Sequence, residues 1–136
     1  MARLPLIAIV DDDASACTAV AALIKAMGFE ARCFPDAAHF LQSDAVGSAH
    51  AVIADLRMPG MSGLELCLAL RARQEPIRTV LMTAYPDAAT ERYARGAGID
   101  GYLAKPCDPE ALLACLGQGD TPPRYSQRTG LSEGSD

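Results

Sequence analysis

Polar side chains that could carry out metal or phosphate chemistry close four apolar stretches of the sequence. They are Asp11, Asp12 and Asp13 after 6–10, Asp55 at the end of 51–55, Thr83 at the end of 79–83, and Lys105 after 101–104. Apolar runs of this length, bounded by turn residues, are typical of buried strands. Because parallel strands of an α/β sheet end at one crevice, we expect these side chains to meet there.

The acidic residues indicate a metal site. Carboxylates held within about 4–6 Å repel each other, and each pair at ~4 Å costs about 4 kcal/mol at an effective dielectric near 20. One lysine cannot offset this repulsion, whereas clustered oxygens with room for water suit Mg²⁺. The run Asp11–Asp13 could instead be a helix cap in a solvated turn, but a cap needs only one aspartate.

Asp55 is then placed to act as a nucleophile. Mg²⁺ would neutralise an incoming phosphoryl group and let the carboxylate attack phosphorus. Lys105 would offer a mobile positive charge to the phosphoryl oxygens, and Thr83 a hydroxyl donor. Alone, Lys105 is an ordinary surface lysine and Thr83 a strand-end hydroxyl; together at neighbouring strand ends they favour phosphoryl chemistry.

The elements that position these residues alternate along the chain. We expect strands at 6–10, 31–34, 51–55, 79–83 and 101–104, helices at about 14–27, from 35, 63–73, 88–95 and 109–116, and a polar loop at 43–50. Such alternation predicts an α/β fold: a doubly wound, five-stranded parallel sheet of order 2-1-3-4-5, flavodoxin-like, with helices on both faces.

Composition bounds the class of protein. The 136 residues suffice for one domain with a core, and because only 5% are aromatic that core must be aliphatic. A net charge of -5 gives no basic footprint for nucleic acid. No apolar run approaches the ~20 residues of a membrane span, and the start of the chain does not form a signal peptide. We therefore expect a cytoplasmic protein that binds neither nucleic acid nor membrane.

Five cysteines show no metal-ligand or C-x-x-C spacing: Cys17, Cys33, Cys67, Cys107 and Cys115. We expect small thiols in or near the core. A redox role for Cys107, two residues after Lys105, is the less favoured alternative.

Four motifs together resemble the receiver domain of bacterial two-component response regulators, which has the CheY-like fold. They are Val10-Asp11-Asp12, the stretch Asp55–Gly63, Thr83-Ala84 and the stretch Tyr102–Pro106. The stretches 82–87 and 97–102 resemble the FixJ-type branch in particular. The resemblance covers residues 4–116, so we expect a receiver domain at 1–116 and, at 117–136, a disordered tail or the start of a linker.

This resemblance implies a role for each acid. Asp55 is the phosphoacceptor, which receives its phosphoryl group from a sensor histidine kinase. Mg²⁺ is held by Asp12, Asp55 and the backbone carbonyl of Arg57, with Asp11 contributing, usually through water.

The resemblance also implies a phosphoryl-binding and switch set. Lys105 and Thr83, with Ala84 beside it, hold the phosphoryl oxygens, and the Lys105–Pro106 bond is expected to be cis. Tyr102, by itself a core residue, turns inward as Thr83 moves. That movement biases a surface made by 88–95, 101–104 and 109–116.

The sequence departs from the family pattern at one place. Cys107 stands where a bulky aromatic is frequent, so we expect loose packing under the last helix. Arg57 and Tyr85 flank the site where side chains tune the lifetime of the phosphoryl group, and their bulk predicts slow self-dephosphorylation.

We therefore predict a magnesium-dependent phosphoprotein of two-component signalling that catalyses only its own phosphoryl uptake and loss. It acts alone through a downstream protein partner, or belongs to a longer regulator with its own output domain, and phosphorylation could drive homodimerisation. One alternative is a Mg²⁺-dependent phosphatase with an aspartate nucleophile, since Asp11 and Asp13 form D-x-D, although no cap insertion is present. The other is a pseudo-receiver that works without phosphorylation, which the complete acid, Thr and Lys set disfavours.

Overall fold

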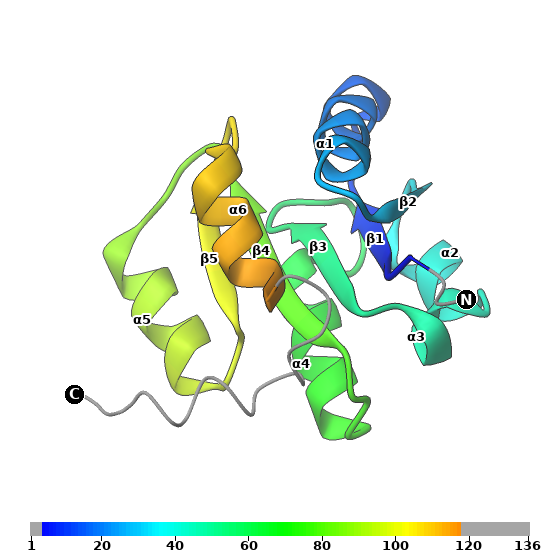
Figure 1. Cartoon of the computed structure of the whole chain (residues 1–136). Coiled ribbons are helices and arrows are strands. Elements are labelled where there is room, and N and C mark those ends of the chain that lie inside the picture. Colours follow the sequence, from blue (N-terminus) through cyan, green and yellow to red (C-terminus); the bar gives the residue numbers. More distant parts are fainter. Residues whose placement is uncertain (1–3, 118–136) are drawn as a thin grey trace.

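The computed structural model describes residues 4–117, in which five strands and six helices follow one another along the chain (Figure 1). Their bounds are β1 Leu6–Val10, α1 Ala14–Ala26, β2 Glu30–Phe34, α2 Ala37–Leu41, α3 Ala45–Ser48, β3 Ala51–Asp55, α4 Gly63–Ala72, β4 Arg78–Thr83, α5 Ala88–Gly96, β5 Gly101–Ala104 and α6 Pro109–Leu116. The predicted receiver span of 1–116 falls almost entirely within this part, whereas the predicted tail lies outside it from residue 118 onward.

All five strands are parallel and lie in the order β2-β1-β3-β4-β5, which confirms the predicted topology. The chain reverses its winding direction between β1 and β3, where doubly wound sheets place their ligand crevice. The strand register also aligns the strand ends. Val10 pairs with Ala54, so Asp11 and Asp55 are the next residues of adjacent strands. Thr83 pairs with Ala104, so Lys105 follows at the same edge.

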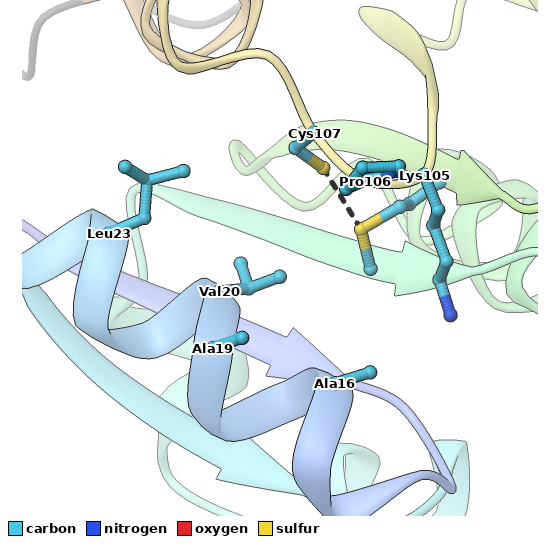
Figure 2. Close-up of a pocket in the computed structure, with 8 residues that line it drawn as sticks. Ala16, Ala19, Val20, Leu23, Lys105, Pro106 and Cys107 are labelled. Atoms are coloured by element: carbon cyan, nitrogen blue, oxygen red, sulfur yellow. Dashed lines mark hydrogen bonds between the residues drawn. The ribbon is translucent and has the colours of Figure 1, made fainter.

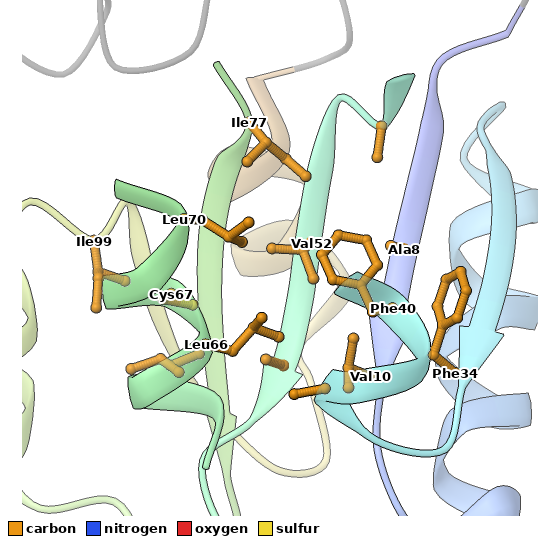
Figure 3. Packing of buried hydrophobic residues seen from close by; sticks show 14 of the residues in the cluster. Ala8, Val10, Phe34, Phe40, Val52, Leu66, Cys67, Leu70, Ile77 and Ile99 are labelled. Atoms are coloured by element: carbon orange, nitrogen blue, oxygen red, sulfur yellow. The ribbon is translucent and has the colours of Figure 1, made fainter. Parts of the chain in front are cut away.

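The sheet carries a hydrophobic core on each face because its side chains alternate. Ile7 and Ile9 of β1 point to the face covered by α1 and α6, and Ala8 and Val10 point to the opposite face. On that opposite face Phe40 of α2 and the buried residues of α4 pack on β1 and β3 (Figure 3). The central strands β3 and β4 are buried along their whole length, as expected for strands covered by helices on both sides.

Five helices begin at a residue whose side chain caps the first turn: Asp13, Asp36, Ser62, Asp87 and Asp108. At α1 the carboxylate of Asp13 accepts hydrogen bonds from the backbone N–H groups of Ser15 and Ala16, at 2.9 and 3.2 Å. This is the capping role that one aspartate of the acidic run was expected to fill. Asp13 is thereby separated in function from Asp11 and Asp12.

The predicted polar loop at 43–50 is wrong in one respect, because it contains the single helical turn α3. Ala45 is fully buried in this turn, and Ala49 closes it with a backbone hydrogen bond to Ala45 at 2.8 Å. A segment of four residues is too short to show a helical repeat, so its burial rather than its periodicity decides the conformation.

The carboxyl end of α6 is hydrogen-bonded to residues at the start of β3 and β4, at the end of the sheet opposite Asp11 and Asp55. Arg78, at the start of β4, is 2% exposed and donates from Nε to the carbonyl of Cys115 at 2.8 Å. His50, just before β3, bonds through Nε2 to the carbonyl of Leu116 at 2.6 Å. These side chains satisfy carbonyls that the last turn of a helix leaves without internal partners. No helix within residues 4–117 is both long and apolar enough to cross a membrane.

Candidate functional site

Two buried acids and one exposed acid gather where β1 and β3 end. Asp11 is 2% exposed and Asp55 is 8% exposed, while Asp12 projects into solvent. One carboxylate oxygen from each of the three lies within 4.8 Å of the others. Two of these acids come from adjacent residues of one strand end and the third from its neighbour, so the geometry follows directly from the strand register.

Lys105 reaches this cluster from the end of β5. Its Nζ donates to Oδ2 of Asp11 at 3.0 Å and lies 3.4 Å from Oδ2 of Asp55. The second oxygens are held by backbone N–H groups: Asp13 donates to Asp11 at 2.9 Å, and Arg57 donates to Asp55 at 3.3 Å. The ammonium group therefore separates two carboxylates that would otherwise face each other.

The site electrostatics oppose ionisation of Asp55. Burial, followed by the nearby charge of Asp11, raises the pKa of the Asp55 carboxyl, and Lys105 only partly reverses this. Burial would by itself lower the pKa of Lys105. The hydrogen bond and charge of Asp11, with a smaller effect of Asp55, outweigh burial and raise the pKa of Lys105. The lysine thus stays charged, and the cluster as a whole favours additional positive charge.

The residues that follow β4 lie beside the cluster but bond to their own segment. Thr83 is buried, and its hydroxyl accepts a hydrogen bond from the backbone N–H of Tyr85 at 3.1 Å. Ala84, between them, is exposed. The ring of Tyr85 is 68% exposed and lies under the guanidinium of Arg57, with 5.5 Å between the guanidinium carbon and the ring centroid. Arg57 and Tyr85 therefore form a rim next to Asp55.

Tyr102 is buried in β5 and bonds to the segment before α5. Its hydroxyl accepts from the backbone N–H of Asp87 at 3.0 Å and donates to the Asp87 carbonyl at 3.4 Å. These bonds tie β5 to the segment between β4 and α5. The sequence had indicated Tyr102 but not this backbone partner, because a main-chain contact leaves no residue-type signal.

The peptide bond between Lys105 and Pro106 is cis. Next to it lies a cavity of about 340 Å³, lined by Ala16, Ala19, Val20 and Leu23 of α1, by Met82, and by the 105–107 segment (Figure 2). The Cys107 thiol contacts the Met82 sulfur at 3.1 Å, with apolar side chains of α1 facing them across the cavity. The cavity borders the short Cys107 side chain but lies against α1, and no residue of the last helix lines it, so the loose packing expected under that helix stays a prediction.

Gly63 is a site residue whose role was not predicted. It opens α4, and a Cβ placed there would collide with the backbone carbonyl of Asp55. The sequence had shown this glycine only as the end of the Asp55–Gly63 stretch and the start of a predicted helix. Its function is to let the start of α4 approach the backbone of the nucleophile candidate closely.

The donor set fits a hard divalent cation. Three carboxylates converge, their charge exceeds what Lys105 supplies, and oxygen ligands are those that such cations prefer. Asp13 lies outside this group because it caps α1.

A doubly wound sheet of order 2-1-3-4-5, with an acidic crevice at its switch point and a lysine from β5, defines a receiver-type signalling domain. The sequence model of the response regulator receiver domain matches residues 7–116, and the chain belongs to this family of two-component signalling domains. It therefore belongs to a class of domains that interact with histidine kinases and output domains.

Individual relatives agree with this assignment. The chain is 33% identical over 108 residues to the transcriptional regulatory protein FixJ of Bradyrhizobium diazoefficiens, covering 79% of this chain and 53% of FixJ. It is 31% identical over 114 residues to the response regulator TodT of Pseudomonas putida, covering 84% and 50%. The chain thus spans about half the length of these relatives. The chemotaxis protein CheY4 of Vibrio cholerae superposes with a TM-score of 0.73 at 26% identity, covering 86% of this chain and 99% of CheY4.

Proposed function

We propose that Asp55 is the phosphoacceptor of this receiver domain. The observation that carries the proposal is the grouping of Asp55 with Asp11, Asp12 and Lys105 at the switch point of the sheet. Asp55 is the member that ends the fully buried strand β3, and its carboxylate accepts a hydrogen bond from the backbone N–H of Arg57. Its side chain keeps 11% exposure, whereas that of Asp11 has none.

Asp11, Asp12, Asp55 and the backbone carbonyl of Arg57 would hold Mg²⁺. When bound, the ion supplies positive charge that offsets the acids and the incoming phosphoryl oxygens. The convergence of the three carboxylate oxygens within 4.8 Å supports this assignment.

The chain's own groups account for the transfer. A carboxylate oxygen of Asp55 forms a bond to phosphorus while the bond from phosphorus to the leaving nitrogen of a phosphohistidine breaks. Lys105, now paired with Asp11 and Asp55, would shift toward a phosphoryl oxygen, because phosphorylation turns the Asp55 carboxylate into an acyl phosphate. Thr83 would donate its hydroxyl to another oxygen, next to Ala84.

Movement of Thr83 would act as the switch. Its hydroxyl accepts from the backbone N–H of Tyr85, so movement of Thr83 toward a phosphoryl oxygen would pull on the segment after β4. Tyr102 bonds to Asp87 in that same segment, so its ring would respond. The affected surface consists of α5, β5 and α6, and it would bind a downstream partner or an output domain, or form a homodimer.

The proposed donor is a sensor histidine kinase, and the proposed setting is the cytoplasm. We propose no contact of this chain with nucleic acid or membrane, in line with its net charge of -5. Chemistry would be limited to self-catalysed phosphoryl uptake and loss. The D-x-D motif of the phosphatase alternative is weakened because Asp13 caps α1 instead of joining the cluster.

Acetyl phosphate with Mg²⁺ tests the proposal. Intact mass should show one added phosphoryl group on the wild-type chain and none on Asp55→Asn. Asp13→Asn is the matched control, since asparagine preserves the helix cap and Asp13 lies outside the cluster, so it should still be phosphorylated. Uptake by Asp55→Asn would move the acceptor to another residue, and turnover of p-nitrophenyl phosphate would favour the phosphatase.

A further inference from the structure

Two of the cysteines face each other between α1 and β2. Cys17, in α1, is 2% exposed, and Cys33, on the edge strand β2, is exposed. Both line one cavity of about 220 Å³ that also borders Asp11 and Asp12. The phosphoryl chemistry proposed above uses neither thiol.

The sheet register fixes the direction of the Cys33 side chain. Cys33 pairs with Ile9 of β1 in a parallel ladder, so both side chains point to the same face of the sheet. That face is covered by α1, since Ile9 and Cys17 share one hydrophobic cluster. The Sγ of Cys17 lies 3.5 Å from the carbonyl oxygen of Ile9. The Cys17 side chain therefore projects from α1 onto Ile9, the residue that pairs with Cys33.

The two thiols line the same cavity and differ in accessibility. Burial first, and then a hydrogen bond with Cys33, raises the pKa of the Cys17 thiol. Cys17 is thus shielded and held protonated, whereas Cys33 is open to dissolved reagents. An accessible thiol next to a second cysteine that can resolve it is the arrangement found in redox-sensing sites.

We propose that Cys17 and Cys33 form a redox-active dithiol that closes to an intramolecular disulfide when a peroxide reaches Cys33. The site requires no metal and no phosphoryl group, so it stands independently of the role assigned to Asp55. It also differs from the lone redox candidate considered in the sequence, Cys107, whose partner in the structure is the thioether of Met82.

The chemistry balances with hydrogen peroxide as the oxidant. The sulfur of Cys33 attacks one peroxide oxygen, the O–O bond breaks, and a sulfenic acid and one water form. The sulfur of Cys17 then attacks the sulfenic sulfur, the S–S bond forms, and the S–O bond breaks. The hydroxyl group leaves with the Cys17 proton as a second water. Two thiols have lost two electrons to one peroxide, and a dithiol reductant reverses the change by exchange.

Mass spectrometry of the folded chain tests the proposal. The protein is treated with limiting hydrogen peroxide, its remaining thiols are alkylated, and it is digested with trypsin. Cleavage places Cys17 in peptide 4–25 and Cys33 in peptide 33–57, each without another cysteine. We expect these two peptides to be joined, the intact monomer to lose two hydrogen atoms, and dithiothreitol to restore both. The oxidised monomer should also melt at a higher temperature, because the cross-link restricts the unfolded chain.

Variants separate this pair from other thiols. Cys33→Ser should abolish the joined peptides and, because Cys33 is exposed, should leave the melting temperature of the reduced protein unchanged. Cys107→Ser is the control and should still form the link. Cys17→Ala provides a second loss-of-link variant in case the serine at position 33 alters the packing.

Three results would overturn the proposal. They are conversion of Cys33 to sulfinic acid without a link to Cys17, a Cys33–Cys33 bond between two chains, and a link in the wild-type chain that joins Cys17 to a cysteine other than Cys33.

Discussion

Replacement of Lys105 by methionine probes the charge balance of the acidic crevice. Methionine keeps most of the length of the side chain and removes its charge. Nζ lies 3.0 Å from Asp11 and 3.4 Å from Asp55, and each attraction amounts to roughly 5 kcal/mol at an effective dielectric near 20. Much of this offsets the cost of burying the charges, but removing one partner leaves the Asp11 side chain, with 0% exposure, uncompensated. The expected loss of unfolding free energy is about 3 kcal/mol.

Urea unfolding without divalent metal measures this loss. With an m-value of about 1.5 kcal/mol/M, the midpoint of Lys105→Met should fall by about 2 M at neutral pH. Lys25→Met is the matched control, because Lys25 is exposed on α1 and should change stability by less than about 0.5 kcal/mol. Since the raised pKa of Asp55 lets it take up a proton first, the loss should shrink as the pH is lowered.

The double variant Lys105→Met/Asp55→Asn should recover part of the lost stability, because one of the two opposed carboxylates is gone. A Lys105→Met protein as stable as the wild type, or equally destabilised at every pH and with asparagine at position 55, would refute the electrostatic account of the site.

Further predictions concern the nucleophile candidate, its backbone and its rim. Asp55→Asn should raise stability at neutral pH by urea unfolding: the folded-state pKa of Asp55 is raised, so its ionisation destabilises the fold as pH rises, and the gain should vanish on acidification. Gly63→Ala should lower the unfolding free energy by about 1–3 kcal/mol, because its Cβ meets the Asp55 carbonyl; an unchanged urea midpoint would contradict this. Arg57→Ala or Tyr85→Ala should shorten the phosphoryl lifetime about two- to fivefold, the equivalent of one exposed cation–π contact; acid-quenched time courses that match wild type would exclude a screening role.

Four of the five strands could be predicted because they are largely buried, apolar runs, whereas β2 is a mostly exposed edge strand of mixed sequence. The errors are of one residue and have a physical cause. Glu30 and Arg78 extend β2 and β4 because their backbones join the ladders opposite Leu6 and Ala51. The polarity of a side chain does not indicate whether its backbone pairs with a neighbouring strand. Arg78 is the clearest case, since a buried arginine requires a partner and its partner is a carbonyl at the distant end of α6.

The residues of the candidate site could be predicted from the sequence for the same reason as the fold. Once the strand order is known, the residues that follow the strands must share one edge, and the structure brings Asp11, Asp12, Asp55 and Lys105 together there. The individual side-chain contacts around the site could not be predicted. Thr83 bonds to the main chain of its own segment, and Cys17 lies over the Ile9 carbonyl in a cavity shared with Cys33, which no residue spacing had indicated. Both depend on local packing, which residue types alone do not specify.

The two side chains that hold the last turn of α6 give this helix the mechanics of a lever. Its far end is bound by Arg78 and His50, while its near end begins four residues after Lys105, and the segment that joins them lines a cavity. A displacement that starts at Lys105 would pass through the segment beside the cavity before it reaches the helix, whose other end is held by hydrogen bonds. The helix would therefore swing about its fixed tip instead of sliding along the sheet, and the largest travel would occur next to the crevice.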